Sequence, residues 1–350
     1  MKINKQKPVM VTGATGYVAG VLVKQLLEAG LTVHAPIRDA QNTDKVQHLK
    51  ALEEKTAGKI IFFEADLLQK GSYKQAMMGC EIIFHTASPF VVNTKNPQKE
   101  LIDPAVKGTE NILHSASEII SVKRIILTSS CAAIYGDNTD ITLTANNRFT
   151  ESDWNTSSSL QHQAYSYSKT LAEQTAWRIY KQQSHWELIV LNPSGVFGPG
   201  IKPHTHSESF NILRQIGDGT MKAGAPKWGM GAVDVRDLAQ AHFQAAFLDN
   251  ASGRYIISGH NTNLFDLART LTPKYGHRYP IPKRMIPKWL LWLIGPFANK
   301  NMTRKMIARN VNISWEGDNS KSVRDLGLNY RPLEQTMTEF FQQLIDHKLL

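Results

Sequence analysis

The sequence predicts an α/β protein with a doubly wound parallel sheet and a smaller, discontinuous α/β part toward the C-terminus. Three observations favour this class. Short runs rich in β-branched residues alternate with amphipathic stretches over residues 8–128, and only short links separate them. A glycine-rich turn directly follows the first of these runs. From residue 193 onward the alternation is lost, and many segments are rich in Pro and Gly.

The predicted elements of the first half alternate between strand and helix. Buried strands are predicted at residues 8–12, 31–37, 59–63, 81–85 and 124–128. Helices are predicted at 18–29, where Gly30 supplies a C-terminal cap, and at 104–117. Pro36 lies inside the second strand and cannot donate to a ladder, so we expect that strand to splay or end there.

The turn after the first strand reads Thr12-Gly13-Ala14-Thr15-Gly16-Tyr17-Val18 and leads into the first helix. Glycines permit a tight turn and let the backbone approach a pyrophosphate, while the helix N-terminus offers unpaired N–H groups and a partial positive charge. A plain strand-to-helix turn is the alternative interpretation. Because more strands follow, the pattern favours a Rossmann dinucleotide site that includes residues 12–18.

The second half of the chain differs in composition. Residues 201–231 show weak periodicity, and residues 260–315 contain five prolines. This composition is typical of loops and short helices that lie over a scaffold, so we expect the substrate-binding part here. The predicted dinucleotide-binding domain covers residues 1–192, and the chain returns to it at residues 232–260. The predicted substrate-binding part comprises residues 193–231 and 261–350.

The end of the second predicted strand bears on the cofactor. NAD sites place an acidic residue there to bind the ribose hydroxyls. Here Arg38 falls where a 2′-phosphate would lie, and its guanidinium fork suits that group. Asp39 could instead pair with Arg38 or bind the hydroxyls itself, and Lys45 is a second candidate phosphate contact. We expect NADP, with NAD as the alternative; the net charge of +10 also favours an anionic cofactor.

Tyr165 and Lys169 lie four residues apart in a predicted helix and therefore share one helix face. Tyr167 points elsewhere and is expected to pack against neighbours. An isolated Tyr has a pKa of about 10, and a nearby ammonium lowers it by favouring the phenolate. We expect Tyr165 to be the catalytic acid and Lys169 to tune its pKa. A hydroxyl to polarise the substrate carbonyl is expected from Thr128-Ser129-Ser130-Cys131, at the end of the fifth strand.

A glycine-rich turn, a Ser-Ser strand end and Tyr-x-x-x-Lys, in this order, resemble the extended short-chain dehydrogenase/reductases of the NAD-dependent epimerase/dehydratase superfamily. The chain is most similar to the branch of dihydroflavonol reductases, cinnamoyl-CoA reductases and microbial aldehyde/ketone reductases. The resemblance covers nearly the whole chain. Further matching segments are His85–Phe90, Asp103–Asn111, Tyr165–Gln174, Asn192–Pro199 and Val233–His242.

The resemblance implies a role for each motif. Ser130 would be the catalytic Ser, with Ser129 as the fallback, beside Tyr165 as the acid and Lys169 as its partner. Arg38 matches the NADP-associated Arg of the branch, and Asp66 and Leu67 would contact the adenine. The residues implied around the rest of the cofactor are Thr86, Ala87, Ser88, Thr128, Ser129, Pro193, Ser194, Gly195 and Val196. Of these, Ala87 and the 193–196 loop would flank the nicotinamide ribose and ring.

Two departures from the family bear on the substrate. Dihydroflavonol reductases carry an Asn five residues after the catalytic Ser, where this chain has Tyr135. Cinnamoyl-CoA reductases carry Asn-Trp-Tyr-Cys-Tyr, where this chain has Gln163-Ala164-Tyr165-Ser166-Tyr167. Both departures argue against those substrates. Candidates for lining an apolar substrate pocket, each with a core role as the alternative, are Phe90, Tyr135, Phe197 and Trp228.

Other features carry weaker expectations. The Lys and Arg residues are scattered and no recognition motif is present, so nucleic acid is not expected as a partner. His204 and His206 have no matching ligand cluster, so no metal is expected. The apolar run 289–294 is too short to span a bilayer; we expect a lid or packing helix, with a membrane-surface contact as the alternative. Two cysteines fit a reducing compartment, which predicts a cytoplasmic protein. The resemblance to the extended family implies a monomer or a homodimer.

These observations predict NADPH-dependent reduction of an aldehyde or ketone, or the reverse alcohol oxidation, by a Ser-Tyr-Lys mechanism on a small-molecule carbonyl substrate. A nucleotide-sugar epimerase or dehydratase with retained NAD is the first alternative, and Arg38 argues against it. A non-enzymatic dinucleotide sensor that binds a protein partner is the second. The presence of both Tyr165 and Lys169 argues against the sensor.

Overall fold

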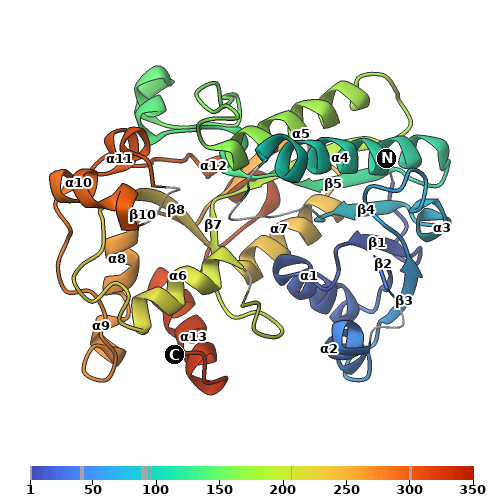
Figure 1. Ribbon diagram of the computed structural model, residues 1–350. Helices are drawn as coiled ribbons and strands as arrows, with labels where there is room; N and C mark the ends of the chain where they lie inside the picture. Colours follow the sequence, from blue (N-terminus) through green and yellow to red (C-terminus); the bar gives the residue numbers. More distant parts are fainter. Residues whose placement is uncertain (1, 40–42, 88–93, 95, 206, 299–301) are drawn as a thin grey trace.

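A computed structural model describes residues 2–39, 43–87, 94, 96–205, 207–298 and 302–350 (Figure 1). Its main sheet has seven strands in the order β3-β2-β1-β4-β5-β6-β9, all paired in parallel. The strands are β1 (Val9–Thr12), β2 (Thr32–Ile37), β3 (Lys59–Glu64), β4 (Ile82–His85), β5 (Arg124–Thr128), β6 (Glu187–Pro193) and β9 (Gly253–Ile257). The predicted doubly wound Rossmann sheet is therefore confirmed.

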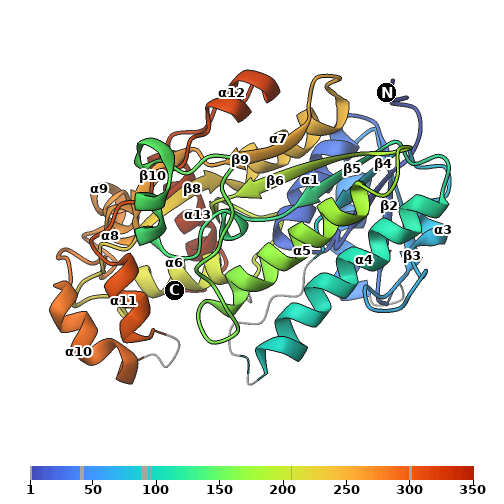
Figure 2. The ribbon, with the colours of Figure 1, turned by 90° about the horizontal axis from the view of Figure 1, so that it is seen from above.

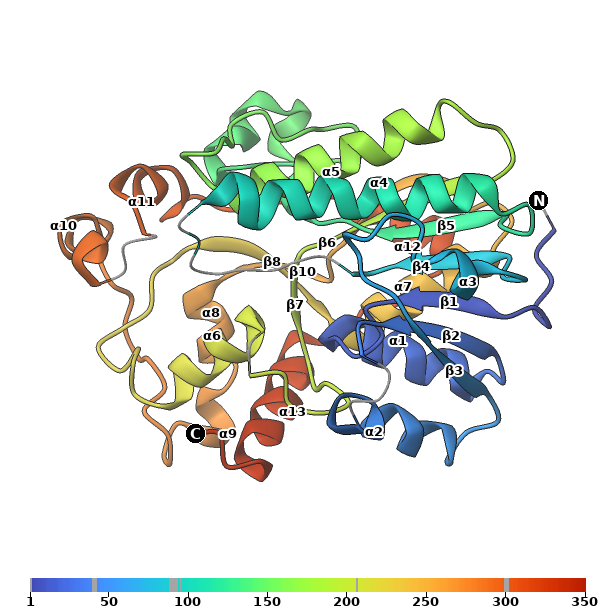
Figure 3. The same ribbon diagram turned by 45° about the vertical axis from the view of Figure 1, so that its right-hand side comes forward.

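Helices cover both faces of this sheet (Figures 1 and 3). One face carries the short α3 (Lys74–Met77) together with α4 (Asp103–Glu118) and α5 (Ala164–Tyr180), whose apolar side chains pack around Ile83 and Val190. The other face carries α1 (Tyr17–Glu28) and α7 (Val235–Phe247), which pack against the strands in a second core. Burial on both faces explains the continuous apolar runs of these strands.

The structure refines the sequence-based expectations. Strands β6 and β9 were not predicted. Of the two outcomes expected at Pro36, an end of β2 does not occur, because the strand pairs with β3 up to Ile37. Its pairs with β1 are Val9–Val33 and Met10–His34, so β2 has splayed from β1 before the proline. The helix α2 (Thr43–Glu53) was not predicted. Its sequence is mostly polar, and the apolar signal is limited to a few residues such as the buried Val46 and Leu49.

A smaller three-stranded sheet lies at the carboxyl end of the main sheet. Its strand order is β10-β8-β7, with β7 parallel and β10 antiparallel to β8. The elements of this part, including the helix that follows β10, are β7 (Gly195–Phe197), α6 (Glu208–Gly217), β8 (Gly229–Asp234), β10 (His260–Asn263), α8 (Leu264–Arg269), α9 (Thr272–Tyr275) and α13 (Leu333–Asp346). Their buried aromatic and aliphatic side chains form a separate core around Phe340 and Phe341. Strand β8 runs directly into α7, so the chain passes from the small sheet back to the main one.

Helices α10 (Lys288–Ala298) and α11 (Arg304–Asn310) form a pair at the outer edge of the small part (Figure 2), and α12 (Ser320–Leu326) packs near β9. Leu291 is buried against Ile307 and Val311, as expected of a packing helix. The exposed apolar side chains of α10 depart from that expectation: they are Trp289, Trp292, Leu293, Ile294 and Phe297. Within the described residues, no helix is both long and apolar enough to cross a membrane.

Short helical turns complete the described structure. A π-helical turn spans Gln98–Ile102 and runs into α4. The 3-10 turns are Cys131–Ala133, Asn138–Leu143 and Ala145–Asn147. They belong to the long connection between β5 and α5, which forms one wall of the cavity described below.

Candidate active site

The glycine-rich turn joins β1 to α1 and brings its backbone close to the end of β4. Gly13 has a φ of 66°, in the left-handed region. A Cβ atom there would lie 3.1 Å from the Cα atom of Ala87. The Gly16 N–H donates to the Gly13 carbonyl at 2.8 Å, which closes the turn at the start of α1. A glycine is therefore required at position 13 for both conformation and space.

Thr12 links the ends of β1 and β4 beside this turn. Its hydroxyl oxygen accepts hydrogen bonds from the N–H groups of Thr86 (3.1 Å) and Ala87 (3.0 Å). The same oxygen lies 3.0 Å from His85 Nδ1. Burial and the charge of Lys169 lower the pKa of His85 to about 3, so the ring is neutral at physiological pH. The predicted cofactor residues Thr12, Thr86 and Ala87 thus form one rigid edge.

Tyr17 follows the turn, but its side chain faces the small part of the molecule. Its hydroxyl donates to the Gly198 carbonyl at 2.5 Å. Its ring meets Phe210 edge-on at 5.4 Å and stacks on Phe340 at 6.1 Å between ring centroids. Of the turn residues predicted to bind the cofactor, Tyr17 therefore uses its side chain to fix the two parts of the fold against one another.

The predicted adenine and 2′-phosphate residues follow β2 and β3. Arg38 is exposed directly after β2, and Asp66 and Leu67 are half-buried after β3. Arg38 and Asp66 both act on Tyr73, whose pKa is raised to about 12 by burial and Asp66, against the effect of Arg38. The two predicted contacts are thus neighbours at one edge of the sheet. Lys45 is exposed on α2.

Ser130 and Tyr165 are brought together at the end of β5. The Ser130 oxygen accepts from the Ala132 N–H at 3.1 Å, and its side chain hydrogen-bonds to Tyr165. Burial raises the pKa of the Tyr165 phenol to about 12, although the Ser130 hydrogen bond acts in the opposite direction. The phenol is therefore protonated at neutral pH, as a proton donor must be.

Lys169 lies one turn further along α5, in a small cavity shared with His85, Thr128 and Glu173. Burial lowers its pKa to about 8, and the negative charge of Glu173 acts against that effect. The expectation that Lys169 lowers the pKa of Tyr165 is not supported, because burial and Ser130 account for the Tyr165 shift. The physical reason is that desolvation of the phenol outweighs the other effects.

The structure separates the three hydroxyls at the end of β5. The Ser129 hydroxyl donates to Glu173 Oε2 at 2.5 Å. The Thr128 hydroxyl lies 2.6 Å from Nε2 of His242, whose Nδ1–H donates to the Leu238 carbonyl. Both hydroxyls are therefore engaged away from Tyr165, and Ser130 is the one that meets it.

Glu173 lies in the matching segment Tyr165–Gln174, but no role was predicted for it. It is fully buried on α5, four residues after Lys169. Besides Ser129, its carboxylate accepts from Asn192 Nδ2 (2.7 Å), Arg254 Nε (2.6 Å) and Trp177 Nε1 (3.2 Å). Arg254 and Asn192 are far from Glu173 in sequence, so no local pattern could identify this cluster.

A cavity of about 700 Å³ opens in front of Ser130 and Tyr165. Its walls come from the β5–α5 connection, the loop after β6, α6 and α11. The residues that line it include Tyr135, His162, Pro193, Ser194, Gly195, Phe197, Glu208, Ile212, Met230 and Met306. Tyr135 and Phe197 line the cavity, and both also have the alternative core role: Phe197 is buried in the core of the small part, and Tyr135 stacks on Phe149. Trp228 does not line this cavity; it packs against α10 and α11. Ser88, Phe90 and His206 lie outside the described residues.

The loop between β6 and β7 contains a polar group whose hydrogen bond is not made within the described residues. Pro193, Ser194 and Gly195 line the cavity, and the buried Ser194 hydroxyl has no hydrogen-bond partner in the described part of the chain. Val196 continues into β7, opposite Val233 of β8. A buried polar atom without a partner is uncommon in a native protein, and a bound molecule commonly supplies the missing contact.

Residues 9–257 match the model of the NAD dependent epimerase/dehydratase family. The chain is 34% identical to a cinnamoyl-CoA reductase of Medicago truncatula over 348 residues, covering 99% of this chain and 98% of the relative. It is also 34% identical to tetraketide alpha-pyrone reductase 1 of Arabidopsis thaliana, covering 98% and 96%. The predicted resemblance is confirmed.

A similar solved structure is that of Gre2 from Candida albicans in complex with NADPH. It superimposes with a TM-score of 0.76 at 27% sequence identity, covering 97% of this chain and 98% of that one. The likeness extends over both the main sheet and the small part.

Proposed function

Because the chain belongs to the NAD-dependent epimerase/dehydratase family, we propose that it is an NADPH-dependent reductase of aldehydes or ketones that uses Ser130, Tyr165 and Lys169. The observation that carries this proposal is the contact between the side chains of Ser130 and Tyr165, which both line the cavity of about 700 Å³. Lys169 lies one helical turn away, under the same strand end.

The residues around the turn fit a dinucleotide. Gly13 keeps the space before α1 free of a side chain, and the Ser194 hydroxyl, beside the cavity, has no partner among the described residues. In this proposal residues 12–18 hold the pyrophosphate, Arg38 and Lys45 the 2′-phosphate, Asp66 and Leu67 the adenine, and 193–196 the nicotinamide. The chemistry that NADPH supplies when bound is hydride donation to a carbonyl carbon.

The side chains then divide the remaining work. Tyr165 holds its proton at neutral pH, because its pKa is about 12, and donates it to the carbonyl oxygen. The Ser130 hydroxyl is fixed by the Ala132 N–H and donates a hydrogen bond to the oxygen as negative charge develops there. Lys169 supplies positive charge beneath both groups and orients the cofactor ribose.

The substrate part of this proposal is the small sheet with its helices, residues 193–231 and 261–350. Ser130 and Tyr165 reach the cavity from the main sheet, whereas Ile212, Met230 and Met306 reach it from the small part. Substrate specificity therefore depends on the small part and on the β5–α5 connection, while the reacting groups lie on α5 and at the end of β5.

Replacing Tyr165 by Phe tests the assignment. We expect turnover of carbonyl substrates to fall by about 100- to 10,000-fold, because the proton donor is removed. NADPH binding, followed by fluorescence titration, should be unchanged. Tyr167→Phe, two residues along the same helix, is the matched control and should keep its turnover. Full activity of Tyr165→Phe in a spectrophotometric assay of NADPH oxidation would refute the proposed mechanism.

A further inference from the structure

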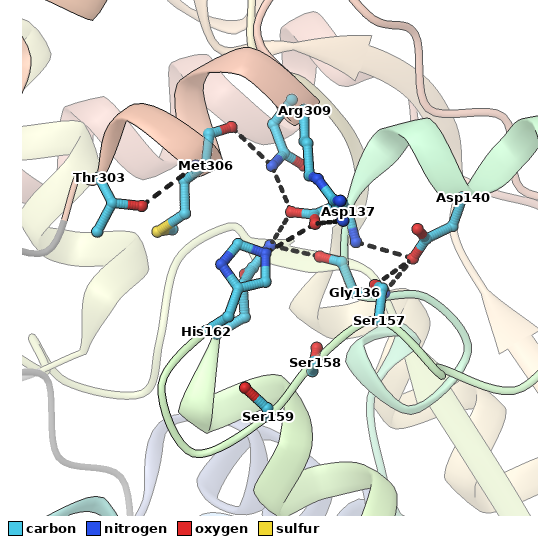
Figure 4. Close-up of polar contacts among 12 residues, drawn as sticks. Gly136, Asp137, Asp140, Ser157, Ser158, Ser159, His162, Thr303, Met306 and Arg309 are labelled. Atoms are coloured by element: carbon cyan, nitrogen blue, oxygen red, sulfur yellow. Dashed lines mark hydrogen bonds and ion pairs between the residues drawn. The ribbon is translucent and has the colours of Figure 1, made fainter.

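His162 forms part of the cavity wall close to the proposed proton donor. It lies three residues before Tyr165, so the two Cα atoms are at most about 11 Å apart. The ring is buried, and its Nε2 lies 2.7 Å from the Asp137 carboxylate (Figure 4). Because the ring also lines the cavity, its other edge is open to a bound molecule.

Asp137 is a fully buried carboxylate that holds this ring in place. It also accepts hydrogen bonds from Gln163 Nε2 (2.9 Å) and Asn310 Nδ2 (2.8 Å), and Arg309 lies 3.3 Å away. Burial alone would raise the pKa of Asp137, but the hydrogen bonds from His162, Asn310 and Gln163 outweigh it, and the pKa lies below its usual value. Asp137 is therefore ionised at neutral pH and can only accept hydrogen bonds.

The charge of Asp137 selects the tautomer of His162. Because the carboxylate is an acceptor, Nε2 must carry the ring proton and donate it. With that proton at Nε2, the neutral form of the ring has its lone pair at Nδ1. In Figure 4 this second nitrogen lies on the side of the ring away from Asp137, and no residue in the described part of the chain hydrogen-bonds to it. The cavity wall thus presents a fixed acceptor.

A second acceptor in the same cavity is also without a partner. Glu208 lines the wall from the first turn of α6, and its buried Oε2 atom has no hydrogen bond within the described residues. A carboxylate and a neutral imidazole nitrogen both require a donor. These two groups therefore share one polarity, and the third unmet group of the cavity, the Ser194 hydroxyl, can accept or donate. A molecule that satisfies His162 and Glu208 must carry a hydroxyl or a comparable O–H or N–H group.

We propose that His162 is a specificity-determining residue whose Nδ1 accepts a hydrogen bond from a hydroxyl of the carbonyl substrate. The inference rests on the proposed carbonyl reduction and narrows its substrates to hydroxylated carbonyl compounds. Asp137 is the positioning residue, because it holds the ring in the Nε2–H tautomer without touching the substrate. A methyl ether in place of the hydroxyl cannot donate and is therefore selected against.

Matched substrates test this proposal in the unmodified protein. The probes are benzaldehydes with a hydroxyl or a methoxy group at each of the three ring positions, together with benzaldehyde itself. We expect kcat/KM for at least one hydroxybenzaldehyde to exceed that of its methoxy partner by about tenfold, the effect of one hydrogen bond. Reduction of the probes without any such preference would overturn the inference and leave the proposed function intact. No reduction of any probe would remove both.

Two substitutions at position 162 distinguish a hydrogen bond to the substrate from a purely structural contact with Asp137. His162→Gln reaches as far as Nε2, so it keeps a donor for Asp137 and loses the acceptor at Nδ1. His162→Asn reaches only as far as Nδ1, so it keeps an acceptor on the cavity side and loses the Asp137 contact. We expect the preference for the hydroxyl to disappear in His162→Gln, mainly through KM, and to persist in part in His162→Asn.

The opposite pattern would contradict the proposal. A preference that survives in His162→Gln and is lost in His162→Asn would show that the ring acts only as a brace for Asp137. NADPH binding and the melting temperature of each variant show that it is folded. If both variants unfold, the hydroxyl-to-methoxy ratio of the unmodified protein decides alone.

Discussion

Two buried carboxylates, Glu173 behind Lys169 and Asp137 in the cavity wall, are each surrounded by four donor side chains among the described residues. Their surroundings nevertheless differ. Glu173 is paired with Arg254, whose side chain is 7% exposed, and two of its other partners, Ser129 and Asn192, are buried. Asp137 faces Arg309, whose side chain is 43% exposed, and a His ring that ends at the cavity.

The difference shows how one type of interaction serves two purposes. Around Glu173 the donors come from α5, the residue after β5, β6 and β9, so the cluster ties the helix that carries Lys169 to the ends of three strands. Around Asp137 the chain of contacts continues through His162 to the wall of the 700 Å³ cavity. The first network joins elements of the main sheet, whereas the second joins the β5–α5 connection to α11 beside the cavity.

Removing each charge should have unequal effects on stability. Glu173→Gln leaves the buried Arg254 without its counter-ion, and we expect the free energy of unfolding to fall by about 3–5 kcal/mol. Asp137→Asn leaves no buried Arg without a counter-ion, because Arg309 is partly solvated, so a loss of about 1–3 kcal/mol is expected. Urea denaturation followed by tryptophan fluorescence measures both. Equal losses would show that the two networks do not differ in the way described.

The neighbouring serines at the end of β5 offer a second comparison, since Ser129 belongs to the Glu173 network and Ser130 to the cavity. Ser130→Ala should lower kcat by about 100- to 1,000-fold, the usual effect of losing a donor to a developing oxyanion. Ser129→Ala should retain most of its turnover and lose about 1 kcal/mol of stability. A variant pair with the reverse ranking would assign the catalytic hydroxyl to Ser129.

The ionisation of Lys169, which lies beside the Glu173 network, is expected to make the activity depend on pH. Its pKa of about 8 means that the ammonium is lost as the pH rises, and kcat/KM for reduction should fall about tenfold between pH 7 and pH 9. The negative charge of Glu173 raises this pKa, so Glu173→Gln should move the alkaline limb toward lower pH. Asp137→Asn should leave the limb in place. Stopped-flow pH profiles of the three proteins are the measurement, and an unmoved limb in Glu173→Gln contradicts the coupling.

Local sequence patterns predicted the main sheet well and the polar networks poorly. Strand 124–128 and helix 104–117 were visible because apolar residues recur at the right period over a short window. The spacing of Tyr165 and Lys169 is equally local. In contrast, Asn310 meets Asp137 across 173 residues, and Arg254 meets Glu173 across 81. Such contacts leave no periodic signal in either partner.

The choice among the three hydroxyls at the end of β5 was also beyond local reasoning. Successive side chains of a strand point to opposite faces, but which face meets Tyr165 depends on how α5 packs. The resemblance to known reductases favoured Ser130. The structure supplies the physical reason, because Thr128 and Ser129 are occupied by His242 and Glu173.

The distance in sequence between Asp137 and Asn310 also has a consequence for synthesis. A ribosome that adds about 5–20 residues per second needs about 10 to 35 seconds to travel between the two positions. During that time Tyr165 and Lys169 already exist on the nascent chain, while the wall of the cavity is still missing. Helix α5 is therefore synthesised before the part of the cavity wall that α11 provides. Until α11 is synthesised, the carboxylate of Asp137 remains exposed to water.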